Sequence, residues 1–199
     1  MFASEISKEE LHKLPLVQFK GKIHLIEHHM AAQFAVNRLM TQPALGFDTE
    51  TRPSFTKRRF NHVALLQLAT DTEAFLFRIC KMGIPQCLLT LLADPNILKI
   101  GVALKNDMDV LKRSTKINPC GFVDLQDAVK KHQITNLGLA KLAGIVLGVR
   151  ISKSQQLSNW ENNMLTEAQQ RYAATDAWMC YLIHEKLNHM NLAPKIDES

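Results

Sequence analysis

Long apolar segments are the first feature that this sequence lacks. No stretch approaches the ~18 uninterrupted apolar residues of a membrane-spanning helix. The start of the chain also lacks the apolar core of a secretory signal, because Glu5, Glu9 and Glu10 follow closely behind Met1. Internal repeats and low-complexity tracts are absent as well. We therefore expect a soluble protein that resides in the cytoplasm.

Paired cysteines are also missing. The four cysteines, Cys80, Cys87, Cys120 and Cys180, form no Cys-x-x-Cys motif, and each has apolar neighbours in the sequence. This pattern is typical of free, buried thiols in a reducing compartment. The sequence predicts neither disulfides nor a zinc site.

The sequence has only a modest excess of positive charge. The formal net charge is +5 and the pI is near 9.1, which fits a polyanionic partner but does not require one. The local cluster Lys57, Arg58 and Arg59 is more suggestive. We predict that it lies in a loop between two strands, where it could reach a phosphate backbone. A solvated turn is the alternative interpretation.

The length of 199 residues and a hydrophobic content of 46% are those of a single domain. Ser7 and Glu10 form a capping-box pattern, which predicts a short helix that ends near Leu14. We expect an N-terminal extension over residues 1–22, one folded domain over residues 23–190 and a polar tail over residues 191–199.

Apolar and alternating stretches predict strands over residues 23–26, 44–51, 63–70, 73–77, 97–102 and 122–123. A short turn near Asp71 predicts antiparallel pairing among the strands over residues 44–51, 63–70 and 73–77. The later strands alternate with helices, so the expected architecture is α/β, with a mixed five- to six-stranded sheet flanked by helices.

The predicted helices cover residues 28–40, 85–93, 106–114, 125–147 with a break at Gly138, and 167–187. We expect the first of these to present Met30, Phe34 and Leu39 to the core. The polar stretch over residues 151–163 is predicted to be a loop near the functional site, anchored by Trp160. Stacking of Trp160 on a nucleic-acid base is the alternative.

Two pairs of polar residues are spaced so that their side chains converge. Asp48 and Glu50 follow an apolar run with one residue between them, so both point to the same face of a strand. Tyr172 and Asp176 are four residues apart in a predicted helix and share one face. Carboxylates gathered in this way repel one another unless hard divalent cations lie between them. The pattern therefore indicates a metal site.

Three segments together resemble the exonuclease motifs of the DEDD superfamily: Phe-Asp-Thr-Glu at 47–50, Gly-Val-Ala-Leu-Lys-Asn-Asp at 101–107 and Tyr-Ala-Ala-Thr-Asp-Ala at 172–177. The last motif has Tyr four residues before its Asp and Arg171 where the histidine branch has His. It is therefore similar to the tyrosine branch, which includes the Werner syndrome protein exonuclease domain and ribonuclease D. The resemblance covers residues 23–187 and implies a ribonuclease H-like fold.

The resemblance also implies catalytic roles and a cofactor, namely two Mg²⁺ or Mn²⁺ ions. Asp48 would bridge both ions, Glu50 and Asp176 would hold the ion that carries the attacking water, and Asp107 would support the other. Tyr172 would orient that water. The implied activity is a two-metal 3'-5' exonuclease that releases nucleoside 5'-monophosphates.

The implied partner is DNA or RNA with a free 3' end. Thr49, Leu65 and Lys153, together with the basic cluster Lys57, Arg58 and Arg59, are the candidate contacts with the nucleic acid. Leu65 could instead belong to the core of the sheet. We predict structural roles for Asp124 and Asp127, at a strand end and on an exposed helix face.

Two other functions remain open from the sequence. One is a catalytically inactive relative that only binds nucleic acid or protein, although such relatives usually lose motif acids that this chain retains. The other is a nuclease for short oligonucleotides. The choice between DNA and RNA depends on contacts with the 2'-OH, which the sequence does not reveal.

Overall fold

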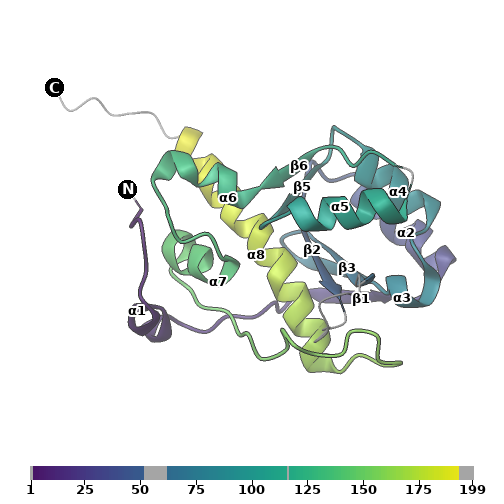
Figure 1. Cartoon of the computed structure of the whole chain (residues 1–199), viewed down its shortest axis with the longest axis horizontal. Helices are drawn as coiled ribbons and strands as arrows, with labels where there is room; N and C mark the ends of the chain where they lie inside the picture. The colour runs from purple at the N-terminus through teal and green to yellow at the C-terminus, as the bar shows by residue number, and fades with distance from the viewer. Residues whose placement is uncertain (1, 52–61, 116, 193–199) are drawn as a thin grey trace.

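The computed structural model describes residues 2–51, 62–115 and 117–192 and contains one six-stranded sheet (Figure 1). The strand order across the sheet is β1-β4-β3-β2-β5-β6. The strands are β1 Lys22–Ile26, β2 Ala44–Thr51, β3 Val63–Ala69, β4 Glu73–Phe77, β5 Leu98–Gly101 and β6 Phe122–Asp124.

The pairing within this sheet is mixed. Strands β2, β3 and β4 pair antiparallel, whereas β1 runs parallel to β4, and β5 runs parallel to both β2 and β6. The structure thus confirms the predicted α/β architecture and the predicted antiparallel group. Strand β2, which carries Asp48 and Glu50, lies in the interior of the sheet with a partner on each side.

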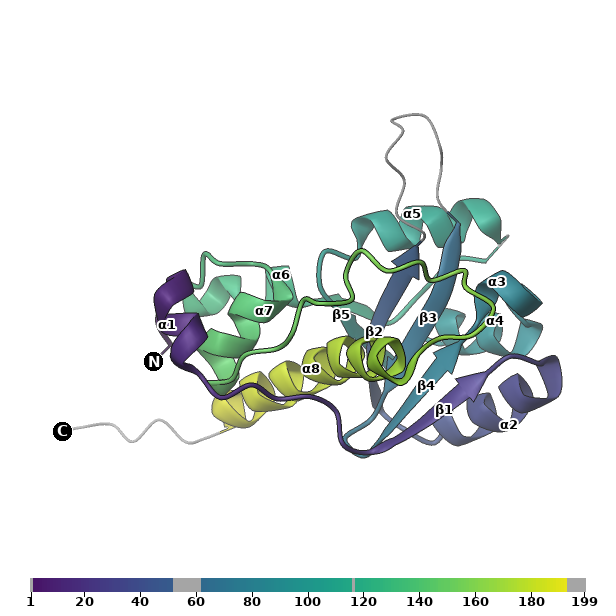
Figure 2. The same cartoon turned by 90° about the horizontal axis from the view of Figure 1, so that it is seen from below.

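Helices cover both faces of the sheet (Figures 1 and 2). The long helix α8 lies on one face, and α2, α4 and α5 share a hydrophobic cluster with the other. The helical segments are α1 Lys8–Lys13, α2 His29–Leu39, α3 Ile79–Met82, α4 Gln86–Ala93, α5 Lys105–Ser114, α6 Leu125–Ala128, η1 Lys130–His132, α7 Leu139–Leu142, η2 Ala143–Leu147 and α8 Glu167–Leu192.

The face that α2 presents to the core differs from the prediction. Leu39 is buried as expected, but Met30 and Phe34 are 74% and 71% exposed. The buried stripe consists instead of Ala32, Ala35, Val36 and Leu39. Small alanine side chains let the helix axis approach the sheet and α4, which turns the two larger side chains outward.

Two further predictions are corrected. Residues 125–147 do not form a helix with a single break. Between α6 and α7 only the short η1 is helical, and Gly138 is the N-cap of α7 rather than a break within a helix. All four cysteines are free, but Cys80 and Cys120 are exposed, and only Cys180 is fully buried. Cys80 lies in the short helix α3 and Cys120 in the connection before β6, where apolar sequence neighbours do not produce burial.

The N-terminal segment packs against the rest of the molecule. The Ser7 hydroxyl caps α1 in the predicted capping box, and Phe19 is buried while its backbone N–H donates to the Thr175 hydroxyl at 2.9 Å. Leu16 forms a parallel bridge with Arg150. The division into an extension, a domain and a tail stays a prediction. Within the described residues, no helix is long and apolar enough to cross a membrane.

Candidate active site

Strand β2 brings Asp48 and Glu50 to the face of the sheet that α8 covers. Gly46 lies on the same face, and a Cβ atom at that position would be 1.8 Å from the carbonyl oxygen of Ala177 in α8. The missing side chain therefore lets the helix backbone contact the strand directly. Asp176, which precedes that alanine, is held at the strand by the same contact.

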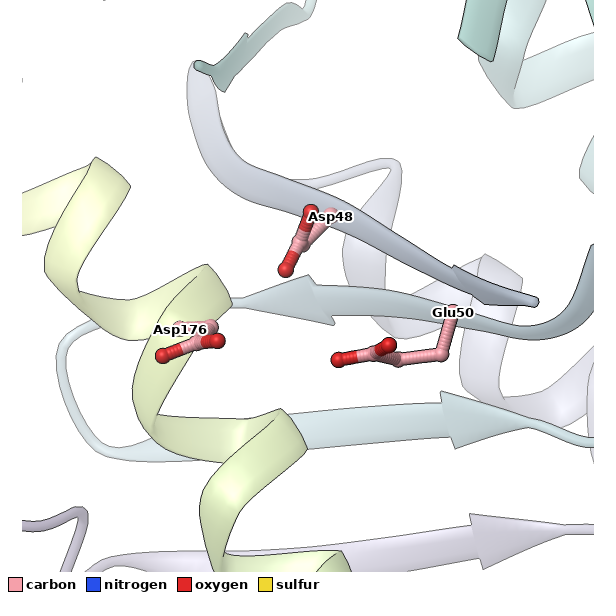
Figure 3. A group of neighbouring side chains, drawn as sticks. All are labelled: Asp48, Glu50 and Asp176. Carbon is pink, nitrogen blue, oxygen red and sulfur yellow. The ribbon is translucent and has the colours of Figure 1, made fainter. Parts of the chain in front are cut away.

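Helix α8 supplies Tyr172 and Asp176 one turn apart, and the two side chains are close enough to shift each other's pKa. Ligand oxygens of Asp48, Glu50 and Asp176 all lie within 4.8 Å of one another. Figure 3 shows these three side chains directed into the space between the strand and the helix. Two segments that are distant in the sequence thus form one carboxylate cluster, which we call the acid triad.

Asp107 reaches the site from α5 and is not a member of the acid triad. Its carboxylate accepts a hydrogen bond from the hydroxyl of Thr49, the residue between the two β2 acids. The turn before α5 places Ala103 at φ 57, in the left-handed region. Asp124 accepts hydrogen bonds from the backbone N–H groups of Ala103 (3.1 Å) and Leu104 (2.9 Å), which supports this turn.

The predicted structural roles of Asp124 and Asp127 are therefore confirmed. Asp124 ends β6, caps α6 and holds the turn that precedes Asp107. Asp127 is an exposed residue of α6 that pairs with Lys130 at 2.6 Å. Neither residue belongs to the acid triad.

Burial is the main cause of raised pKa values in all four motif carboxyl groups. The pKa of Glu50 rises to about 9, and the charge of Asp48 adds to the effect of burial. Burial, together with the charges of Asp176 and Asp107, holds the pKa of Asp48 well above its usual range. The pKa of Asp176 rises to about 7, and that of Asp107 rises as well. Without a cation, the site therefore favours protonated carboxyl groups.

These donors fit a hard divalent cation. Three carboxylates converge from two elements, and a fourth approaches from α5, which is the oxygen-rich set that Mg²⁺ and Mn²⁺ prefer. Mutual repulsion among buried acids is relieved when a cation binds between them. Asp48, Glu50 and Asp176 could hold one ion, and Asp107 could contribute to a second.

Trp160 and Tyr172 pack beside each other at the edge of this site. Their ring centroids are 6.0 Å apart, and Trp160 is fully buried. The predicted anchoring role of Trp160 is confirmed, because a fully buried ring is not available to a base. Burial and the neighbouring Asp176 and Glu50 charges raise the pKa of the Tyr172 phenol, so the hydroxyl stays protonated.

A cavity of about 220 Å³ opens beside Tyr172 and Asp176. Its lining includes Lys153, as the polar loop predicts, and the charge of Lys153 acts to lower the pKa of Asp176 against the larger effect of burial. Lys141 lines the same cavity from α7 and donates a hydrogen bond to Asn136 at 3.1 Å. Sequence reasoning missed Lys141, since nothing near it in the chain resembles a motif.

The other residues that were predicted to contact nucleic acid lie in different parts of the molecule. Thr49 lies between the two β2 acids, and its hydroxyl donates a hydrogen bond to Asp107. Leu65 is fully buried in a cluster with Trp160 and Ala173, which supports the alternative that it belongs to the core. The basic cluster Lys57, Arg58 and Arg59 lies outside the described residues. Gln67, which is fully buried beneath α8, was also missed, because it is a single polar residue within an apolar strand pattern.

A mixed sheet that gathers carboxylates beneath a helix defines a site suited to metal-assisted hydrolysis of phosphate esters. A family model described as "3'-5' exonuclease" matches residues 23–191. The chain therefore belongs to the 3'-5' exonuclease family. Its assignment to the tyrosine branch stays a prediction.

Known relatives share the family assignment. The chain is 33% identical over 187 residues to the mouse bifunctional 3'-5' exonuclease/ATP-dependent helicase WRN, covering 89% of this chain and 13% of that protein. It is 37% identical over 163 residues to exonuclease 3'-5' domain-containing protein 2 of Drosophila melanogaster, covering 80% and 27%. The chain thus spans about a quarter or less of the length of these curated relatives.

Among solved structures, Escherichia coli RNase D superposes with a TM-score of 0.76 at 25% identity, covering 84% of this chain and 44% of that one. The Aedes aegypti Nibbler EXO domain has the same TM-score at 23% identity, covering 88% and 94%, which shows a shared fold. Both likenesses agree with the predicted ribonuclease H-like architecture.

Proposed function

We propose that this chain hydrolyses phosphodiester bonds at the free 3' end of DNA or RNA and releases nucleoside 5'-monophosphates. The observation that carries the proposal is the acid triad, whose ligand oxygens lie within 4.8 Å of one another in a chain of the 3'-5' exonuclease family. Asp107 and Tyr172 complete the motif set beside it.

The proposed cofactor is a pair of Mg²⁺ or Mn²⁺ ions held by Asp48, Glu50, Asp107 and Asp176. When bound, such ions neutralise charge on the scissile phosphate and lower the pKa of water. The Tyr172 hydroxyl, which stays protonated, positions the attacking water by a hydrogen bond instead of acting as a general base.

The cavity that contains Lys141 and Lys153 is proposed to bind phosphate groups of the substrate. Both lysines line this cavity together with Tyr172 and Asp176, so a strand that enters the site passes cationic side chains. Thr49 and the cluster Lys57, Arg58 and Arg59 remain proposed contacts. Escherichia coli RNase D is described as an exoribonuclease involved in structured RNA processing, which makes RNA one substrate to test.

The test is degradation of 5'-labelled single-stranded DNA and RNA of one sequence, with Mg²⁺, with Mn²⁺ and with EDTA. We expect a ladder that shortens from the 3' end, stops in EDTA and disappears in Asp48→Ala. Asp127→Ala is the matched control, because Asp127 is an exposed acid outside the site. Binding without cleavage by the folded wild type would favour a nucleic-acid-binding module, and preference for dinucleotides over long strands would favour the short-oligonucleotide nuclease.

A further inference from the structure

The Gln67 side chain is a buried polar group whose hydrogen bonding is unexplained. It lies in β3 and is fully buried. Within the described part of the chain, neither its amide nitrogen nor its amide oxygen has a hydrogen-bond partner. Buried polar side chains in folded proteins nearly always have such partners, and leucine or methionine would fill this volume without the penalty. The Gln67 amide therefore requires a hydrogen-bond partner.

The register of the sheet places Gln67 directly opposite Asp48. The two residues are partners in the antiparallel β2–β3 pair, so their side chains emerge on the same face, about 5 Å apart at Cβ. Helix α8 covers that face: Gly46 contacts Ala177 on one side of the Asp48 position, and Leu65 packs in a cluster with Ala173 on the other. The fully buried amide thus lies on the strand next to a carboxylate of the acid triad.

Within the described residues, no side chain donates a hydrogen bond to the half-buried Asp48 carboxylate. The backbone of Thr49 favours its charged form, whereas the charges of Asp176 and Asp107 disfavour it. Carboxylates that bind metal are normally held by hydrogen bonds from neighbouring groups, which fix their orientation and increase their affinity for the ion. The Gln67 N–H groups are donors of the right kind, on the adjacent strand and at the matching position.

We propose that Gln67 is a positioning residue for Asp48, to which its amide N–H donates a hydrogen bond, directly or through one buried water, when the cation is bound. The inference rests on the proposed function, since it presumes that Asp48 is a metal ligand. Gln67 contacts neither substrate nor cation, and it acts only by fixing the carboxylate that does.

The experiment measures Mn²⁺ binding to Gln67→Met by calorimetry and by electron paramagnetic resonance of the free ion, with no nucleic acid present. We expect about tenfold weaker binding or more, which is the usual effect of removing a residue that supports a ligand. Thermal unfolding in EDTA should not be impaired, because the substitution replaces an unpartnered amide with an apolar side chain of similar size.

Leu68→Met is the matched control. Leu68 is also fully buried, is the next residue of β3 and points to the opposite face, so its substitution should leave Mn²⁺ affinity within about twofold of wild type. Gln67→Leu provides a second variant of similar volume if the methionine packs poorly.

If the role of Gln67 is only structural, its substitution leaves the Mn²⁺ affinity unchanged. If Gln67→Met and Gln67→Leu bind Mn²⁺ as wild type does, the inference is wrong, whatever happens to their unfolding temperatures. Failure of the proposed function gives a different result, in which wild type and Asp48→Ala bind Mn²⁺ with equal affinity. The two failures are therefore distinguished in one set of titrations.

Discussion

At the scale of single residues, the environment of Tyr172 determines what the phenol can do. Burial and the charges of Asp176, Glu50 and Asp48 raise its pKa, so it is a donor and not a base at neutral pH. Helix α8 holds the phenol one turn from Asp176, beside the acid triad. A side chain in this state can orient a water molecule, but it contributes no charge to metal binding.

Tyr172→Phe is therefore expected to lower kcat by about 10²-fold or more while Mn²⁺ affinity changes less than about threefold. Single-turnover kinetics and Mn²⁺ titration would measure the two effects separately. Tyr181→Phe is the matched control, since Tyr181 lies on the same helix and does not line the cavity beside the acid triad. Equal kcat for wild type and Tyr172→Phe would remove the proposed role.

The raised pKa of Glu50 makes the stability of the metal-free protein depend on pH. The ordinary pKa is 4.5 and the folded value is about 9, so folding favours the protonated acid. This contribution is fully present below pH 4.5 and is lost as pH rises toward 9. Thermal unfolding in EDTA should show a decline over this window that is smaller in Glu50→Gln. Identical slopes for the two proteins would contradict the assignment.

The same protonation equilibria compete with cations. A carboxylate must ionise before it binds a metal. Below the pKa of that carboxylate, the apparent metal affinity therefore rises about tenfold for each unit by which the pH increases. Wild-type Mn²⁺ affinity should therefore rise steadily between about pH 6 and pH 8, and calorimetry in buffers of different ionisation enthalpy should detect proton release. An affinity that does not change with pH would show that the acids are ionised before the ion binds.

At the scale of elements, the site depends on the contact between β2 and α8. The strand places its acids on one face by alternation, and the helix places its phenol and acid one turn apart. The sequence predicts both of these local patterns, because each follows from backbone periodicity. It does not predict the contact between them, which requires that Gly46 lie under the carbonyl of Ala177.

Gly46→Ala tests that contact. A Cβ atom 1.8 Å from a backbone oxygen forces the helix away from the strand, so we expect a loss of about 3 kcal/mol in the free energy of unfolding and weaker Mn²⁺ binding. Chemical denaturation measures the first effect. Gly138→Ala is the control, since no atom of the described residues would lie within 4 Å of a Cβ added there, and it should change stability by less than about 1 kcal/mol.

The limits of sequence reasoning also appear at this scale. The hydrophobic pattern of residues 28–40 correctly predicts a helix, but not that alanines 32 and 35 face the core while Phe34 faces solvent. Side-chain hydrophobicity gives no measure of how closely two backbones approach. Gln67 and Lys141 were missed for a related reason, since their positions beside the site come from strand register and helix placement.

At the scale of the whole molecule, the net charge of +5 says little about where a polyanion binds. The proposed binding place is the cavity that Lys141 and Lys153 line beside Tyr172 and Asp176. Phosphate contacts of this kind release counterions from nucleic acid, so binding weakens as salt increases. The slope of that dependence reports how many contacts are made.

Lys153→Gln should weaken binding of single-stranded substrate and reduce the salt slope by about one unit. Fluorescence anisotropy across a series of salt concentrations, in Ca²⁺ to prevent turnover, provides the measurement. Lys8→Gln is the control, because Lys8 is an exposed residue of α1 that does not line the cavity. Unchanged slope and affinity in Lys153→Gln would show that the strand takes another path.

The direct contact between β2 and α8 also has a consequence for protein synthesis. Asp48 and Asp176 lie far apart in the sequence, so only a piece of the chain that reaches from β2 into α8 contains the acid triad. Because the long-range contact completes the site, a nascent chain acquires its nuclease centre only after α8 has left the ribosome and docked.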